Sequence, residues 1–281
     1  MNTAAPSPSS AQLFATARPP YKVTSLRVLR SEWAKFWSLR STWIALGLAL
    51  LFMVAFGVIA AMQAKNQLTT YGQLRGHFAG DTGVGLALFG INFGQLVLGV
   101  LGVLVAAGEY STGLIRSTLA AVPRRLPVLW AKAAVVGPVA LVVGAIGAFA
   151  AFGIGARIIS GTPVALSLSS AGVVRSLLGG GLYLALVAVI GLALGALLRS
   201  AAGGIAVLVA TLLLVPGLVA LLPSSWENDV SPYLPSNAGG SMYAISPAST
   251  DLSPTAGLAV LAGWTVLVLA GGAWRLKRSD A

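Results

Sequence analysis

The sequence predicts an all-α fold: a polytopic membrane protein with six transmembrane helices, an N-terminal amphipathic elbow helix and both termini in the cytoplasm. The 281 residues are 57% hydrophobic and only 9% charged, whereas a soluble domain has about 25% charged residues. The apolar residues form six runs, each of about the 20 residues that a helix needs to cross a bilayer. The lysines and arginines lie between these runs, with a strong bias to one side.

The residue inventory excludes several classes of function. The chain has no cysteine and one histidine, His77, which excludes thiol catalysis, zinc–thiolate sites and most histidine-based metal sites. The net charge of +11 is spread between the apolar runs and is not gathered in one patch. This distribution indicates membrane orientation, and we expect no nucleic-acid partner and no metal site.

The first 20 residues are rich in proline, serine and alanine and show no hydrophobic periodicity. We therefore predict a disordered cytoplasmic tail over 1–20 and a single transmembrane domain over 21–281. No short apolar core precedes Thr42, so the first apolar run is expected to serve as an uncleaved signal-anchor.

Residues 24–40, TSLRVLRSEWAKFWSLR, predict an amphipathic helix just before the first span. Apolar side chains recur at three- and four-residue spacing and form one stripe: Leu26, Leu29, Trp33, Phe36 and Trp37. The polar side chains Arg27, Arg30, Ser31 and Lys35 are expected on other faces. Such a helix lies in the membrane interface with its cations near anionic headgroups. It is either a surface anchor or an elbow that also contacts a cytoplasmic partner.

The six predicted spans follow in order, with a proline in the third and the fifth. They cover residues 43–62, 86–107, 133–155, 177–198, 204–222 and 255–273. Pro138 and Pro216 are each expected to be able to kink their span, because neighbouring helices can satisfy the freed backbone groups.

The distribution of basic residues predicts the orientation. With the N-terminus inside, fourteen of the 18 lysines and arginines fall in cytoplasmic segments. The other four fall outside: Lys65, Arg75, Arg157 and Arg175. This positive-inside bias places both termini in the cytoplasm.

The largest inner loop, residues 108–132, is more than a polar connector. Apolar residues alternate with polar ones over its first half, which predicts a short helix from about Ser111 to Ala121. Ser111 or Thr112 would cap this helix and Pro123 would end it. Glu109 is expected to face its first turn, where an anion is favourable. A solvated connector that only sets orientation would not need the apolar residues, so we favour a membrane-parallel helix that docks against another protein.

Few polar residues lie inside the spans. Asn92 and Gln95 are one turn apart and are expected either to bond across a helix interface or to line a path. The pairs Gly90–Gly94 and Gly191–Gly195 permit close helix contact. Outside the spans, the aromatic residues of the last outer loop either lie at the membrane interface or contact substrate, and we favour the interface: Trp226, Tyr233 and Tyr243.

The interior of the predicted spans constrains the energy source of any transport. None of the six runs contains Asp, Glu, Lys, Arg or His, the groups on which ion-coupled carriers usually rely. No Gly-x-x-x-x-Gly-Lys-Ser/Thr loop is present to hold ATP phosphates. A transporter of this kind would depend on a separate ATPase subunit.

Three motifs resemble one family. The first is Gly108-Glu109-Tyr110-Ser111-Thr112-Gly113-Leu114-Ile115-Arg116, followed by Pro123-Arg124-Arg125 and Ala131-Lys132. The second runs from Glu32-Trp33-Ala34-Lys35 through Arg40-Ser41-Thr42-Trp43. The third is Tyr233-Leu234-Pro235-Ser236-Asn237-Ala238-Gly239. Their order on a six-span frame is similar to bacterial permease subunits of ATP-binding cassette transporters, of the type-2 exporter class common in actinobacteria.

The resemblance implies a partner system. It implies an elbow helix that includes Glu32, Trp33, Lys35 and Trp37, and a coupling segment, residues 109–122, that docks on a cytoplasmic ATP-binding cassette subunit. ATP and magnesium would bind that subunit and not this chain. It also implies a second permease copy or homologue, a location in the bacterial cell membrane, and short re-entrant or surface helices in the outer loop 223–254.

Two rival interpretations remain at the level of sequence. A non-transporting membrane scaffold that anchors a cytoplasmic complex would share most of these features. An intramembrane enzyme is disfavoured, because the spans lack a Ser–His pair, paired aspartates and a zinc site. The mostly apolar path favours an amphipathic or lipophilic cargo.

Overall fold

The computed structural model describes residues 24–79, 81–122, 125–245 and 250–278, without the side chains of His77, Arg116, Leu119 and Ala121. The predicted tail, residues 1–20, lies outside the described residues, as does Pro123, the predicted end of the loop helix. All regular structure in the described part is helical, which confirms the all-α part of the prediction.

Short and long helices alternate along the chain. The first half contains α2 (Ser25–Ser38), α3 (Arg40–Tyr71), η1 (Gly76–Phe78), α4 (Gly83–Leu88), α5 (Ile91–Ser111), α6 (Leu114–Ala121) and α7 (Leu126–Ile158). The second half contains α8 (Val173–Leu198), α9 (Ala201–Val209), η2 (Ala210–Leu214), α10 (Val215–Val219), α11 (Ser224–Val230), η3 (Ser231–Tyr233), α12 (Pro235–Tyr243) and α13 (Pro254–Arg278).

Six helical segments are long and apolar enough to cross a membrane, as predicted. They are Arg40–Tyr71, Gly83–Ser111, Leu126–Ile158, Val173–Leu198, Ala201–Val219 and Pro254–Arg278. By helix length and composition the chain is therefore a multi-pass membrane protein. Most helices extend beyond the predicted runs, because polar residues continue a helix past its apolar part.

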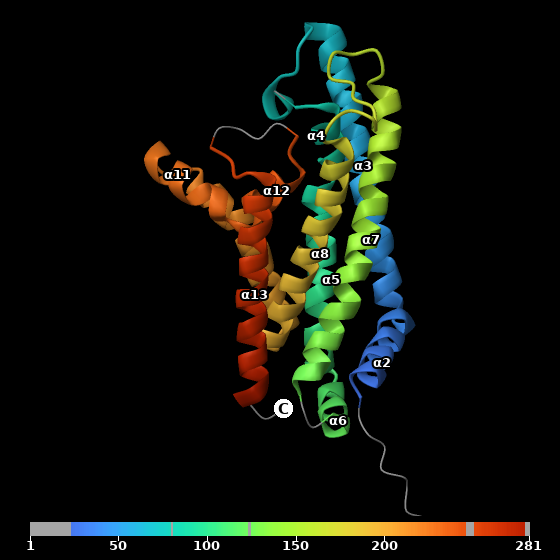
Figure 1. Ribbon diagram of the computed structural model, residues 1–281, viewed down its shortest axis with the longest axis vertical. Helices are drawn as coiled ribbons and strands as arrows, with labels where there is room; N and C mark the ends of the chain where they lie inside the picture. The colour runs from blue at the N-terminus through green and yellow to red at the C-terminus, as the bar shows by residue number, and fades with distance from the viewer. Residues whose placement is uncertain (1–23, 80, 123–124, 246–249, 279–281) are drawn as a thin grey trace, which may run out of the picture.

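The helices form an elongated bundle around α8 (Figure 1). The central helix α8 packs against α5, α7 and α13, and α3 packs on the outer side of α5 and α7. The short helices α2 and α6 lie at the same end of the bundle as the C-terminal end of α13, at the bottom of Figure 1. This end, called the α2/α6 end below, is the one that the basic residues predict to be cytoplasmic.

Glycines allow α5 and α8 to approach closely. A Cβ atom at Gly191 would lie 2.1 Å from the carbonyl oxygen of Gly99, and one at Gly102 would lie 2.0 Å from that of Ala188. Gly195 similarly faces Val103. The predicted pair Gly191–Gly195 thus serves a helix contact within the chain, and Gly90 and Gly94 do the same against Met53 of α3.

The two span prolines behave differently. Pro138 lies inside a continuous α7. Pro216 follows a π-helical turn, in which the backbone N–H of Val215 donates to the carbonyl of Ala210, five residues earlier. Because proline has no N–H to donate, the helix ahead of it changes its hydrogen-bonding pattern here. The span ends at Val219, earlier than the predicted residue 222.

The outer loop contains three short helices, and α12 packs between α8 and α13. The guanidinium of Arg175 donates to the carbonyls of Met242 and Ala244 at 3.1 and 2.8 Å, and Ser176 donates to that of Tyr243. These bonds hold the end of α12 against α8. The ring of Tyr243 packs against the buried Tyr183 at 5.7 Å, and its interface role stays a prediction. Trp226 and Tyr233 are exposed, and their interface role stays a prediction.

Candidate functional site

The inward face of α2 differs from the predicted apolar stripe. Val28, Glu32 and Phe36, one per turn, are buried against the bundle, whereas Leu26 and Trp33 are exposed. The helix thus turns a glutamate inward and part of its apolar stripe outward. Lys35, predicted on another face, also reaches inward from this helix. An ionised side chain is stable in such a position only if opposite charges accompany it.

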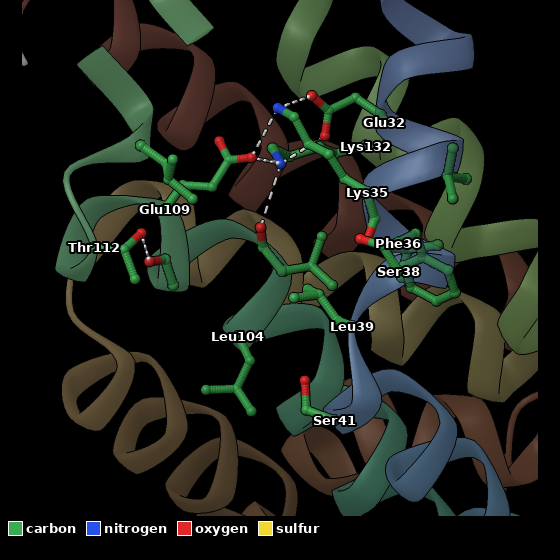
Figure 2. A pocket seen from close by; sticks show the side chains of 15 residues that line it. Glu32, Lys35, Phe36, Ser38, Leu39, Ser41, Leu104, Glu109, Thr112 and Lys132 are labelled. Atoms are coloured by element: carbon green, nitrogen blue, oxygen red, sulfur yellow. Dashed lines mark hydrogen bonds and ion pairs between the residues drawn. The ribbon is translucent and has the colours of Figure 1, made fainter. Parts of the chain in front are cut away.

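Four charged residues from three helices supply that pairing. Glu32 and Lys35 of α2, Glu109 of α5 and Lys132 of α7 form one cluster, called the charge quartet below (Figure 2). The Lys132 Nζ atom donates to Glu32 Oε2 at 2.7 Å and to Glu109 Oε1 at 2.8 Å. The Lys35 Nζ atom donates to Glu32 Oε1 at 2.8 Å and to Glu109 Oε1 at 3.1 Å. Each lysine therefore bridges both glutamates.

The quartet is electrically neutral at a position where burial of a single charge would be energetically unfavourable. Three of its side chains are at most 10% exposed, and only Lys35, at 41%, has substantial access. Two lysines and two glutamates sum to no net charge, so the burial cost is offset by pairing. Burial alone would lower the pKa of the Lys35 ammonium, but Glu32 and Glu109 outweigh it and hold that pKa above its ordinary value. Lys35 therefore stays protonated at physiological pH.

One oxygen of the quartet has no partner. Glu109 Oε2 is buried and accepts no hydrogen bond from any described residue, while Oε1 accepts from both lysines. The sequence predicts that Glu109 faces the first turn of the loop helix. Its bonded oxygen instead accepts from lysines of α2 and α7.

The loop helix α6 is shorter than predicted and starts differently. It begins at Leu114 after Gly113, whose φ of 73° is left-handed and favours glycine. Ser111 and Thr112 do not cap it, because both hydroxyls donate back to the carbonyl of Gly108 at the end of α5. The hydroxyl of Thr118 in α6 instead accepts from Lys35 at 3.2 Å. One hydrogen bond thus joins α6 to the quartet.

The other residues of the predicted coupling segment have different surroundings and do not all lie at the quartet. The Arg199 guanidinium, in the residue that follows α8, lies over the ring of Tyr110 at 5.2 Å, so Tyr110 contacts another part of the chain. Ile115 is buried, and Leu114 is exposed. Arg116 lies in α6, but its side chain is outside the described part of the structure.

The predicted elbow tryptophans form an aromatic cluster beside the quartet. Trp37 packs edge-on against Trp33 and Phe36 at 5.5 and 5.4 Å, and against Trp43 of α3 at 4.8 Å. The indole of Trp43 also donates to the carbonyl of Trp37. These contacts fix the angle at which α2 meets α3.

Lys132 is the site residue that sequence reasoning missed, although a signal existed. The predicted third span began at residue 133 and left this lysine in the loop. In the structure α7 begins at Leu126, and the residues three and four positions on either side of Lys132 are apolar: Val128, Leu129, Val135 and Val136. A lysine at the centre of such a stripe must face the protein.

Asn92 and Gln95 lie away from the quartet and have different surroundings. Gln95 is buried and accepts from the hydroxyl of Tyr183 in α8. Asn92 is exposed and donates to the carbonyl of Phe89 in its own helix. Gln95 therefore bonds across a helix interface, one of the two roles considered for the pair.

A cavity of about 380 Å³ adjoins the quartet. The quartet, Ser38, Ser41 and Thr112 line it together with apolar residues (Figure 2). The apolar part of the lining includes Phe36, Leu39, Leu104, Val105, Val135 and Val136. The cavity thus combines one charged region with one apolar region.

Comparison with known proteins does not assign the chain to a family. No protein-family model matches the chain, and no curated protein shows significant similarity to it. The fold and the geometry of the quartet are therefore the basis for a proposal of function.

Proposed function

We propose that this protein is the membrane-spanning permease subunit of an ATP-driven transporter of the ATP-binding cassette type. It would export an amphipathic or lipophilic compound by alternating access. A separate cytoplasmic ATPase subunit, with ATP and magnesium bound, would supply the energy, and a second permease copy or homologue would complete the path. The bacterial cell membrane is the proposed location.

The observation that carries this proposal is the charge quartet. It joins the surface helix α2 to the spans α5 and α7, and Lys35 joins the quartet to α6 through Thr118. A force applied to α6 at the α2/α6 end would therefore reach two spans through short ionic contacts. Ionic contacts with fixed geometry transmit a displacement, whereas a solvated connector would absorb it.

The exposed side of α6 provides a surface for the partner. Leu114 is 58% exposed, and the neighbouring Ser117 and Ala120 are exposed as well. An exposed leucine on a short helix, beside arginines of the same segment, suits docking into a groove of another protein. This surface is where we propose that the ATPase subunit binds.

The test is co-purification of the tagged protein in mild detergent, followed by an ATPase assay of the protein that accompanies it. We expect a nucleotide-binding protein whose ATP turnover falls in the variants Leu114→Asp, Glu109→Ala and Arg116→Ala. The control is Lys65→Ala, an exposed lysine at the opposite end of α3, which should leave turnover unchanged. Turnover that is indifferent to all three variants would favour a scaffold that binds without coupling. Absence of any nucleotide-binding partner with correctly inserted protein would overturn the proposal.

A further inference from the structure

We propose that the cavity beside the charge quartet binds a neutral amphipathic alcohol. The hydroxyl of this ligand would donate a hydrogen bond to Glu109 Oε2, and its apolar chain would lie against Leu104, Val135 and Val136. This inference does not depend on the proposed transport function, because it concerns binding to the chain alone.

The size and lining of the cavity suit a small molecule with an apolar body. A volume of about 380 Å³ falls within the range of roughly 300–1,000 Å³ that is usual for ligand sites. Leu104 of α5 and Val135 and Val136 of α7 line it, and the exposed Leu39 and Leu104 border it. A fully polar ligand would bury these side chains without an apolar partner, so the ligand needs a hydrocarbon part.

The neutral quartet favours a ligand without net charge. Both lysines of the quartet bond to both of its glutamates, and their third protons go to Thr118 and to the carbonyl of Val105. An anionic ligand would therefore find no free ammonium proton, and a cationic ligand would add a third positive charge beside two carboxylates. Burial of such an unbalanced charge is unfavourable. A neutral molecule avoids this cost.

One acceptor at the cavity is left without a donor. Glu109 lines the cavity, its side chain is 10% exposed, and its Oε2 atom accepts no hydrogen bond from any described residue. A buried carboxylate oxygen without a donor is unfavourable, and a ligand that supplies the donor removes this penalty. Oε2 is itself covered, but the carboxylate can rotate about its last side-chain bond, where the torsion is soft, and turn Oε2 toward the cavity. A hydroxyl supplies the donor and adds no charge.

The two regions of the cavity lie in the same order as the two parts of an amphiphile in a membrane leaflet. On α5, Leu104 lies five residues before Glu109, and on α7, Val135 and Val136 follow Lys132 by three and four residues. The apolar wall is therefore closer to the middle of the bundle than the charged groups, by about 4–8 Å at 1.5 Å per residue. An alcohol in the leaflet at the α2/α6 end keeps its hydroxyl near water and its chain toward the membrane centre. It can therefore enter the cavity sideways without turning over.

The test is photolabelling of the purified full-length protein in detergent with a decanol that carries a diazirine in its chain. Mass spectrometry of the labelled peptides measures incorporation into α5 and α7. Unlabelled decanol should compete at a concentration at least about tenfold lower than decyl methyl ether, which has the same chain but no hydroxyl proton, since a hydrogen bond to a charged group gives about this factor. Equal competition by the ether would overturn the hydrogen bond to Glu109. Stronger competition by decylammonium than by decanol would show a cation site and overturn the neutral assignment.

A first variant tests the hydrogen bond. In Glu109→Gln the lysines require the amide oxygen, so the NH₂ group takes the place of Oε2 and can only donate. The preference for decanol over the ether should then disappear, whereas the matched control Glu227→Gln in α11 should keep it. A preference that survives in Glu109→Gln would overturn the proposal.

A second variant tests the cavity, because Glu109→Gln can disturb folding. Leu104→Trp adds bulk at a cavity residue outside the quartet and should abolish labelling of α5 and α7. The matched control is Leu48→Trp in α3, since Leu48 is 38% exposed against 41% for Leu104 and lies outside the cavity lining. Labelling that is unchanged by Leu104→Trp would overturn the proposal.

Discussion

At the scale of single residues, the molecule concentrates its few internal charges in one place. Glu32, Lys35, Glu109 and Lys132 lie on three helices that are far apart in the sequence, yet they bond within 3.1 Å of one another. Because the pairs are buried, removing one partner leaves an uncompensated charge, while removing an opposite pair leaves none. This asymmetry makes the quartet testable by itself.

We predict that Lys132→Met destabilises the protein by about 3–5 kcal/mol, the usual cost of breaking a buried ion pair. The double variant Lys132→Met with Glu32→Gln should recover part of this loss, since Glu109 keeps Lys35 as its partner. The measurement is thermal unfolding in detergent, with Lys65→Met as the control at an exposed lysine. A double variant less stable than Lys132→Met alone would contradict the account of the quartet as a balanced unit.

At the scale of elements, glycine positions decide which helices meet most closely. The carbonyl oxygens of Gly99 and Ala188 occupy the space where side chains at Gly191 and Gly102 would begin. Such contacts replace the hydrophobic effect as a driving force, because lipid is as apolar as the helix surface. The close packing of α5 against α8 therefore depends on glycines, which leave room for the backbone of the neighbouring helix.

We predict that Gly191→Val forces α5 away from α8 and lowers stability by about 1–3 kcal/mol or more, as overpacking does. The matched control is Gly153→Val in α7, where a Cβ atom would have no neighbour within 4 Å. Melting temperatures of the two variants in the same detergent provide the comparison. Equal melting temperatures would show that the close contact of α5 with α8 is unimportant.

The sequence predicts the six membrane-spanning helices better than it predicts the charge quartet. Long apolar runs fix the six spans, since length and apolarity are local properties. The quartet depends on the rotation of α2 and on where α7 begins, which are set by packing. Lys132 fell outside the predicted span by one residue, and Glu32 and Lys35 were assigned by resemblance, without their partners. The start of α6 was misplaced because Ser111 and Thr112 bond backward to α5.

At the scale of the whole molecule, orientation decides which end can meet a cytoplasmic partner. The lysines and arginines predict that the α2/α6 end, with Arg275, Lys277 and Arg278 in the last turn of α13, is inside. The proposed ATPase docking surface lies at this end. An experiment on orientation therefore bears on that proposal.

We predict that a cysteine replacing Ser117 in α6 reacts with a membrane-impermeant maleimide only after cells are permeabilised. A cysteine replacing Ser169, between α7 and α8, should react in intact cells. Both serines are exposed, and the natural chain has no cysteine, so the unmodified protein is the background control. The reverse labelling pattern would mean that the bundle is inserted the other way.

The central position of α8 has a consequence for how the protein is made. Ribosomes synthesise the chain from its N-terminus, so α3, α5 and α7 enter the bilayer before α8, which packs against α5 and α7, exists. Until residue 198 is synthesised, the face of α5 that carries Gly102 lacks α8 as its partner. The packing of α8 against α5 and α7 therefore forms last among these four helices, and the face of α5 that α8 will cover stays open to lipid during that interval.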